Sequence, residues 1–216
     1  MKIPNNWTFR DSNVANNFDT HVREQLPWYD LATSLIKHVG RHYIPQDGVV
    51  YDIGASTGNV GNALLPTLAA RNAKFIAIEN SAEMAKIYKG PETLVLDDAI
   101  NVSYQKSDFI VCFLVLMFLT PTNRKKLLSK LYKSLNKGGA ILIFEKFLPE
   151  SGYVSIISQR LSLAGKLEAG ATPERIIEKE LSLSGIQRPL NLNEIPRGAS
   201  EIFRYGDFAG WIIEKK

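Results

Sequence analysis

The feature that most constrains the fold is the stretch from Val49 to Asn59. It begins with Val49–Ile53, a short apolar run rich in β-branched residues, which predicts a buried strand. A turn of small residues bounded by Gly54 and Gly58 follows, and apolar residues then recur at helical spacing. Glycine lets a backbone pass close to a ligand because it has no Cβ atom. Strand, glycine turn and helix in this order therefore predict the opening of a nucleotide-binding βαβ unit.

A second strand strengthens this interpretation, because a glycine turn alone also occurs in α/β proteins that bind no nucleotide. Ser56 stands where the dinucleotide pattern G-x-G-x-x-G has its middle glycine. The second strand, Lys74–Ile78, ends in Glu79, at the distance of about twenty residues where a carboxylate can accept hydrogen bonds from ribose hydroxyls. The two strands together favour a nucleotide site.

Asp52, the acidic residue near the end of the first strand, indicates which nucleotide. The sequence Asp-Ile-Gly-Ala-Ser-Thr-Gly of residues 52–58 resembles motif I of the class I S-adenosylmethionine-dependent methyltransferases, which have a Rossmann-like fold. The resemblance implies that Asp52, Gly54, Ala55, Ser56 and Gly58 surround the amino-acid end of S-adenosylmethionine. It also makes S-adenosylmethionine the expected cofactor.

The order of elements along the chain predicts an α/β fold. Five strands alternate with helices, and two final strands at 201–205 and 208–214 are joined by a Gly-Asp turn typical of hairpins. We therefore predict one methyltransferase domain, 1–216, with a mostly parallel seven-stranded sheet and a C-terminal antiparallel hairpin. Residues 1–45 should form an N-terminal arm or lid and the first helix, and residues 147–200 should form a helical cap.

Local patterns give more detailed expectations. Asp30 is a plausible N-cap for a helix over 30–43, and Pro66 suggests a kink or break in the helix after the glycine turn. The helix over 121–135 carries basic residues, Arg124 among them, which predict a solvated face or, alternatively, a surface for nucleic acid or an acidic partner. Residues 136–139 should separate this helix from a fifth strand over 140–144.

Composition bounds the functions that remain. The formal net charge of +4 is compatible with an anionic substrate or nucleic acid but requires neither. The single cysteine, Cys112, excludes an internal disulfide and a cysteine-based zinc site, and we expect no metal. The longest apolar run, 109–119, is too short to span a membrane. The N-terminus does not resemble a signal segment, so we expect a cytoplasmic protein without a membrane partner.

A narrower resemblance extends from Phe18 to about Phe147. The matching pieces are Phe18-Asp19, Pro27-Trp28-Tyr29, and residues 50–56, 76–81, 118–121, 135–140 and 145–147. In order and spacing they resemble the carboxy-S-adenosylmethionine synthase family, which acts in wobble-uridine modification of tRNA. They also resemble phage- and prophage-borne methyltransferases.

This resemblance implies roles for further residues. Tyr29 would contact the cofactor, Glu79 with Asn80 would hold the ribose, and Asp98 with Ala99 would flank the adenine. The chain also departs from the family at two places.

The first departure is at Phe113, where the family has an asparagine after the fourth strand. The second lies near Leu181, where the family has the arginine that grips the extra carboxylate. Loss of that arginine removes a bidentate anchor, although Arg160, Arg175, Arg188 or Arg204 could replace it.

An aromatic ring at 113 suits a methyl sulfonium through cation–π attraction. We therefore expect methyl transfer from S-adenosylmethionine. Synthesis of carboxy-S-adenosylmethionine from S-adenosylmethionine and prephenate is the alternative, and a cofactor-binding subunit without chemistry is a third.

The catalytic candidates are Tyr29, Asp30 and His21, and Glu145 is a further candidate base. Structural roles are open for each of them, since Asp30 can cap a helix and His21 can lie on a solvated arm. Tyr29 and Phe113 are the aromatic candidates beside the sulfonium.

The methyl acceptor is expected to be a small molecule or a nucleoside or RNA. DNA base methylation is disfavoured. Residues 113–116 lack the Asn/Asp-Pro-Pro-Tyr/Phe motif, and the only cysteine follows Val111 rather than a proline. A homodimer is compatible with these expectations.

Overall fold

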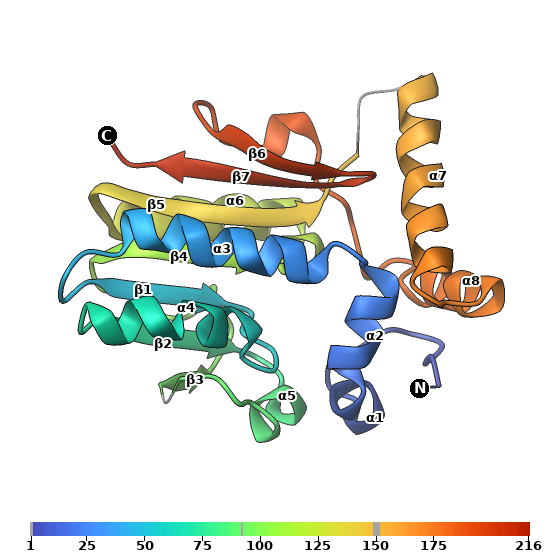
Figure 1. Ribbon diagram of the computed structural model, residues 1–216, viewed down its shortest axis with the longest axis horizontal. Coiled ribbons are helices and arrows are strands. Elements are labelled where there is room, and N and C mark those ends of the chain that lie inside the picture. The colour runs from blue at the N-terminus through green and yellow to red at the C-terminus, as the bar shows by residue number, and fades with distance from the viewer. Residues whose placement is uncertain (1, 92, 149–151) are drawn as a thin grey trace.

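A computed structural model describes residues 2–91, 93–148 and 152–216 (Figure 1). The strands are β1 Val49–Ile53, β2 Lys74–Glu79, β3 Leu94–Leu96, β4 Ser107–Phe113, β5 Leu135–Lys146, β6 Ser200–Tyr205 and β7 Phe208–Glu214. The helices are α1 Ser12–Asn16, α2 Phe18–Gln25, α3 Tyr29–Tyr43, α4 Asn59–Ala70, α5 Ala82–Lys86, α6 Pro121–Ser134, α7 Tyr153–Glu168 and α8 Pro173–Ser182. Two short 3₁₀ helices span Leu116–Phe118 and Leu192–Glu194.

The strands form one seven-stranded sheet in the order β3-β2-β1-β4-β5-β7-β6. The pairs among β1 to β5 are parallel, whereas β7 runs antiparallel to both β5 and β6. This confirms the predicted Rossmann-like methyltransferase sheet and its terminal hairpin. The strand order reverses between β1 and β4, and ligands of open α/β sheets bind beside the carboxyl ends of the strands at such a point.

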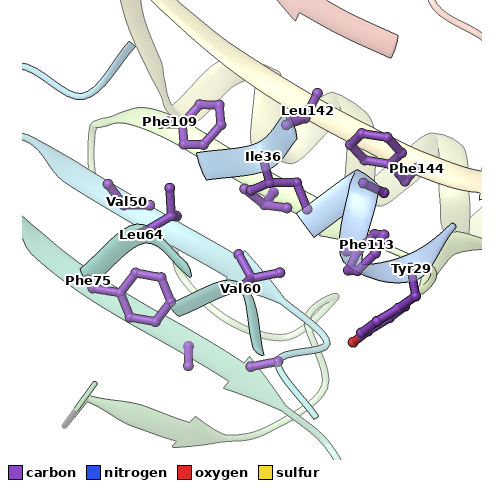
Figure 2. Close-up of a cluster of buried hydrophobic side chains, with 14 of the residues drawn as sticks. Tyr29, Ile36, Val50, Val60, Leu64, Phe75, Phe109, Phe113, Leu142 and Phe144 are labelled. Carbon is purple, nitrogen blue, oxygen red and sulfur yellow. The ribbon is translucent and has the colours of Figure 1, made fainter. Parts of the chain in front are cut away.

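Both faces of the sheet are covered, which explains why its central strands β1 and β4 are mostly apolar. Alternate residues of β1 face opposite sides: Val50 packs toward α3 and α4, and Tyr51 packs toward α6. On the first side, Ile36 of α3 and Leu64 of α4 are fully buried, and Figure 2 shows both of them within this cluster. Cys112 of β4 is buried on the α6 side.

The arm and the cap gather at one end of the sheet. In Figure 1, α1 and α2 lie beyond the carboxyl ends of the parallel strands, and α7 and α8 stand beside them. The two regions are tied together where the Trp7 amide donates to the Ser182 carbonyl at 2.9 Å. Among the described residues, the segment expected to form the arm contains α1 and α2, and the segment expected to form the cap contains α7, α8 and the 3₁₀ helix Leu192–Glu194.

Several boundaries differ from the sequence expectations. Helix α3 begins at Tyr29 with Trp28 at its N-cap, so Asp30 lies in the first turn and is not the cap. Helix α4 continues through Pro66 without a break. The expected turn at 136–139 lies inside β5, which pairs with β4 from Leu135 onward through an irregular register. None of these changes moves the strand ends that surround the glycine turn.

Within the described ranges, no helix is both long and apolar enough to cross a membrane.

Candidate active site

The glycine turn connects β1 to α4 and is held against β2. The amides of Gly54 and Ala55 both donate to the Ile78 carbonyl, at 2.8 and 2.9 Å. Gly54 has φ +72°, and a Cβ there would lie 2.7 Å from Val115 Cγ2. Ser56 has φ +51°, a left-handed conformation that glycine adopts without strain. Ser56 therefore has the backbone conformation of the glycine that it replaces in the sequence pattern.

Glu79, the last residue of β2, joins the turn to the segment after β2. Its Oε2 accepts from the Ser56 amide and its Oε1 accepts from the Ser81 amide, both at 2.8 Å. Burial raises the pKa of the Glu79 carboxyl, and the backbone hydrogen bonds oppose that rise. A carboxylate offers about four lone-pair sites, so Glu79 keeps acceptor capacity toward the cavity beside it.

A cavity opens beside these residues at the carboxyl ends of β1, β2 and β4. It encloses about 990 Å³ of empty space, including its open mouth. Its lining includes most of the residues expected to bind a cofactor: Tyr29, Gly54, Ala55, Ser56, Glu79, Asn80, Asp98, Ala99 and Phe113. Phe9 and Phe18 of the arm close one side. We call this the adenosyl cavity.

Asp52 lies behind the glycine turn with 1% of its surface exposed. Its Oδ2 has no hydrogen-bond partner among the described residues. Burial, and then the nearby Glu79 carboxylate, raise the pKa of Asp52 to about 8. A buried carboxylate without a partner is costly, and an ammonium group brought beside it would relieve that cost. Asp52 does not itself line the adenosyl cavity, and neither does Gly58, which is the N-cap of α4.

Tyr29 and Phe113 form an aromatic pair on the wall of the cavity. Their ring centroids are 5.0 Å apart with an interplanar angle of 27°. Figure 2 shows the two rings side by side at one end of the core cluster. Burial raises the pKa of the Tyr29 hydroxyl, so the phenol is neutral near neutral pH. The pair offers aromatic surface rather than a base.

The remaining catalytic candidates lie away from the adenosyl cavity. Asp30 pairs with Arg23 at 2.9 Å, and 67% of its side chain is exposed. His21 of α2 is buried and stacks on Trp7 with ring centroids 5.3 Å apart. Burial, and then the nearby Lys179, lower the pKa of His21 to about 3. The structure therefore does not place His21 on a solvated arm.

The structure places Glu145 and Arg124 differently from what the sequence predicts. Glu145 is fully buried and accepts from the amides of Val115, Leu116 and Met117 at 2.6–3.1 Å. Its carboxylate therefore shapes the segment after β4 and does not line the adenosyl cavity.

Arg124 is 1% exposed and pairs with Glu194 at 2.9 Å. Its Nε also donates to the Leu116 and Leu119 carbonyls. The prediction that Arg124 lies on a solvated face was wrong, because the segment leading to Glu194 covers it.

In the described part of the chain, no three His, Cys, Asp or Glu side chains are close enough together to hold a metal ion.

The adenosyl cavity fits S-adenosylmethionine. In its lining, the free lone pairs of Glu79 suit the ribose hydroxyls and the aromatic pair suits a sulfonium. Behind the glycine turn, the unpartnered Asp52 oxygen suits the amino group. The sheet order, the glycine turn and this cavity define a class I S-adenosylmethionine-dependent methyltransferase fold.

Comparison with known proteins gives the same class and a narrower family. A family model described as "Methyltransferase domain" matches residues 50–139. A carboxy-S-adenosyl-L-methionine synthase of Staphylococcus epidermidis is 31% identical, with 98% of each chain covered. Another, of Wolinella succinogenes, is 29% identical over 95% of this chain and 92% of that protein. The chain belongs to the carboxy-S-adenosyl-L-methionine synthase family, and it is an enzyme that uses S-adenosylmethionine.

Solved structures share the fold at low sequence identity. The plantazolicin methyltransferase BpumL, solved with S-adenosylhomocysteine, has a TM-score of 0.64 at 16% identity and covers 94% of this chain and 90% of that one. Human N-acetylserotonin methyltransferase, solved with S-adenosylmethionine, has a TM-score of 0.61 at 13% identity and covers 96% of this chain and 57% of that one.

Proposed function

We propose that the protein transfers the methyl group of S-adenosylmethionine to a small-molecule acceptor. The observation that carries this proposal is the stacked pair of Tyr29 and Phe113 on the wall of the adenosyl cavity. Aromatic faces attract a methyl sulfonium, whereas the family's asparagine at this place is missing. The helices α1, α2, α7 and α8, which gather at the carboxyl ends of the parallel strands (Figure 1), favour a small molecule over a nucleoside within RNA.

Bound S-adenosylmethionine supplies a methyl group on a good leaving group. The acceptor atom would bond to the methyl carbon and give up its proton while the carbon–sulfur bond breaks, and the electron pair of that bond would stay on sulfur in S-adenosylhomocysteine. The protein's part is to align the acceptor and exclude water.

Individual residues have separate parts in this proposal. Gly54, Ala55 and Ser56 hold the amino-acid end with Asp52, and Glu79 with Asn80 holds the ribose. Asp98 and Ala99 flank the adenine. These assignments agree with the lining of the cavity, apart from Asp52, which would act from behind the turn.

Carboxy-S-adenosylmethionine synthesis is the second candidate. Two relatives that match nearly their whole length bear that name. In this case the product is a modified cofactor rather than a methylated acceptor.

One experiment separates the candidates. The purified enzyme is incubated with S-adenosylmethionine, with and without prephenate, and the adenosyl products are identified by mass spectrometry. We expect no carboxy-S-adenosylmethionine, and we expect S-adenosylhomocysteine to form when an acceptor is supplied. Prephenate-dependent formation of carboxy-S-adenosylmethionine would overturn the proposal in favour of the second candidate.

A further inference from the structure

A second cavity adjoins the adenosyl cavity on the side of the cap. The two share Phe9, Phe18, Leu114 and Phe118 in their walls. Most of the remaining lining comes from α2, the end of β5, α7 and α8, with Trp7 of the arm. The lining is completed by Leu26, Met117, Leu183, Gln187 and Phe208. A molecule in this cavity would therefore lie next to whatever occupies the adenosyl cavity. We call it the acceptor cavity.

Positive charge exceeds negative charge in this lining. Lys146, Lys166 and Lys179 face it, and Glu180 is its one carboxylate among the described residues. Lys166 forms an ion pair with Glu180 at 2.7 Å. Lys146 forms ion pairs with Glu180 and with Asp207, both at 3.5 Å.

Lys179 differs from the other two lysines. No carboxylate of the described residues forms an ion pair with it, and its ammonium lies over the Trp7 ring. It is 8% exposed, and burial lowers its pKa to about 5. The Glu180 charge raises the pKa of Lys179 and Lys166 lowers it, but Glu180 forms its ion pairs with Lys146 and Lys166. A buried ammonium without an ion-paired carboxylate is unfavourable, so an anion beside Lys179 would be stabilised.

Two uncharged side chains make a second, independent observation. His21 is 3% exposed and Gln25 is 6% exposed, and both line the acceptor cavity. In the part of the chain that the structure describes, neither ring nitrogen of His21 and neither amide atom of Gln25 has a hydrogen-bond partner. Buried polar groups are nearly always hydrogen-bonded, so these atoms indicate a polar ligand in the cavity.

The walls indicate the shape of that ligand. The acceptor cavity is bounded by several aromatic rings: Trp7, Phe9, Phe18, Phe118 and Phe208. The Phe9 and Phe118 rings meet edge to face at 5.1 Å. Leu114, in the shared wall, has φ +61°, and such strained conformations of non-glycine residues cluster at active sites.

We propose that the acceptor cavity binds a hydroxylated aromatic carboxylic acid as the methyl acceptor, with its carboxylate on Lys179, its other polar atoms on His21 and Gln25, and its ring hydroxyl toward the adenosyl cavity, where the oxygen would bond to the methyl carbon and release its proton. This rests on the proposed methyl transfer and names the substrate class of the same site. The acid group would lie toward the cap, and the ring would extend along the aromatic walls toward the shared wall at Leu114.

The test uses matched acids and amides. The full-length protein is first titrated with S-adenosylhomocysteine by calorimetry, which tests the adenosyl cavity alone. The loaded protein is then titrated with benzoate, phenylacetate and 4-hydroxybenzoate, and with the primary amide of each. At least one acid should bind, and its amide should bind at least about tenfold more weakly, the scale of one lost charge-assisted contact.

Variants assign the binding to the cavity. Lys179→Met should weaken binding of the acid about tenfold and leave S-adenosylhomocysteine binding unchanged. Lys179→Arg should retain the preference for acid over amide, and Gln25→Leu should weaken both ligands. Lys126→Met, on an exposed position of α6, is the matched control and should change nothing.

The outcomes distinguish the two proposals. Failure to bind S-adenosylhomocysteine would refute the proposed function itself. Normal S-adenosylhomocysteine binding with no acid preferred over its amide, or with Lys179→Met binding acids normally, would overturn only the acceptor cavity.

Discussion

Replacing Glu79 by alanine should weaken cofactor binding and stability together. The side chain accepts two backbone hydrogen bonds, from Ser56 and Ser81, each at 2.8 Å. Hydrogen bonds to charged groups contribute about 1.5–3 kcal/mol each, so losing two should cost about 3 kcal/mol of unfolding free energy at the lower end. For a chain of this size that corresponds to a fall in melting temperature of roughly 6–12 °C.

The loss in binding is separate from the loss in stability. If Glu79 holds the ribose, its removal should cost at least about 1.5 kcal/mol of binding free energy, a little over tenfold in Kd. Calorimetric titration with S-adenosylhomocysteine, well below the melting temperature of the variant, measures this directly.

Glu83→Ala is the matched control, since Glu83 is a carboxylate on the neighbouring helix α5 that pairs only with Lys86 at 2.7 Å among the described residues. It should change affinity and melting temperature little, because surface ion pairs contribute about 0–1 kcal/mol. Unchanged affinity in Glu79→Ala, or an equal loss in Glu83→Ala, would refute the assignment of Glu79 to the ribose.

Three further predictions follow from the same site. Gly54→Val should fold but lose S-adenosylhomocysteine binding in calorimetry. The reason is that the new Cβ would lie 2.7 Å from Val115 Cγ2, at a φ of +72°. Normal binding would show that the turn has only a structural role. The pKa of Asp52 rises from 3.8 to about 8 on folding, so the folded state binds the extra proton in that window and stability should fall as pH rises through it. Urea unfolding should show a shallower fall in Asp52→Asn, and identical pH profiles would contradict the assigned pKa. Hydrogen exchange should show ligand-dependent protection over residues 18–29, and equal exchange with and without S-adenosylhomocysteine would exclude a lid.

The sheet and the glycine turn were predictable because their determinants are local. A strand buried on both faces is apolar throughout, and the turn needs glycine-like backbone at fixed positions. Ser56 adopts that backbone conformation, so the turn keeps its shape although serine replaces the middle glycine of the pattern. The position of Glu79 beside the turn was predictable for the same reason, since it follows from the end of a strand.

Residues whose roles depend on distant segments were not predictable. Arg124 belongs to a basic run in the sequence, and only the packing of the segment around Glu194 makes it buried. The sequence suggests that Glu145 is a free carboxylate at the end of a strand, but in the structure it accepts hydrogen bonds from the amides of residues 115–117. The acceptor cavity combines α2, β5, α7 and α8, and no local pattern brings Lys179 to His21.

The most direct measurement is a crystal structure of the protein grown with S-adenosylhomocysteine. We predict the amino-acid end at residues 54–56 with its ammonium toward Asp52, the ribose hydroxyls on Glu79, and the sulfur beside Tyr29 and Phe113. A ligand bound in another cavity, or bound in this cavity with its ribose away from Glu79, would contradict this account of the active site.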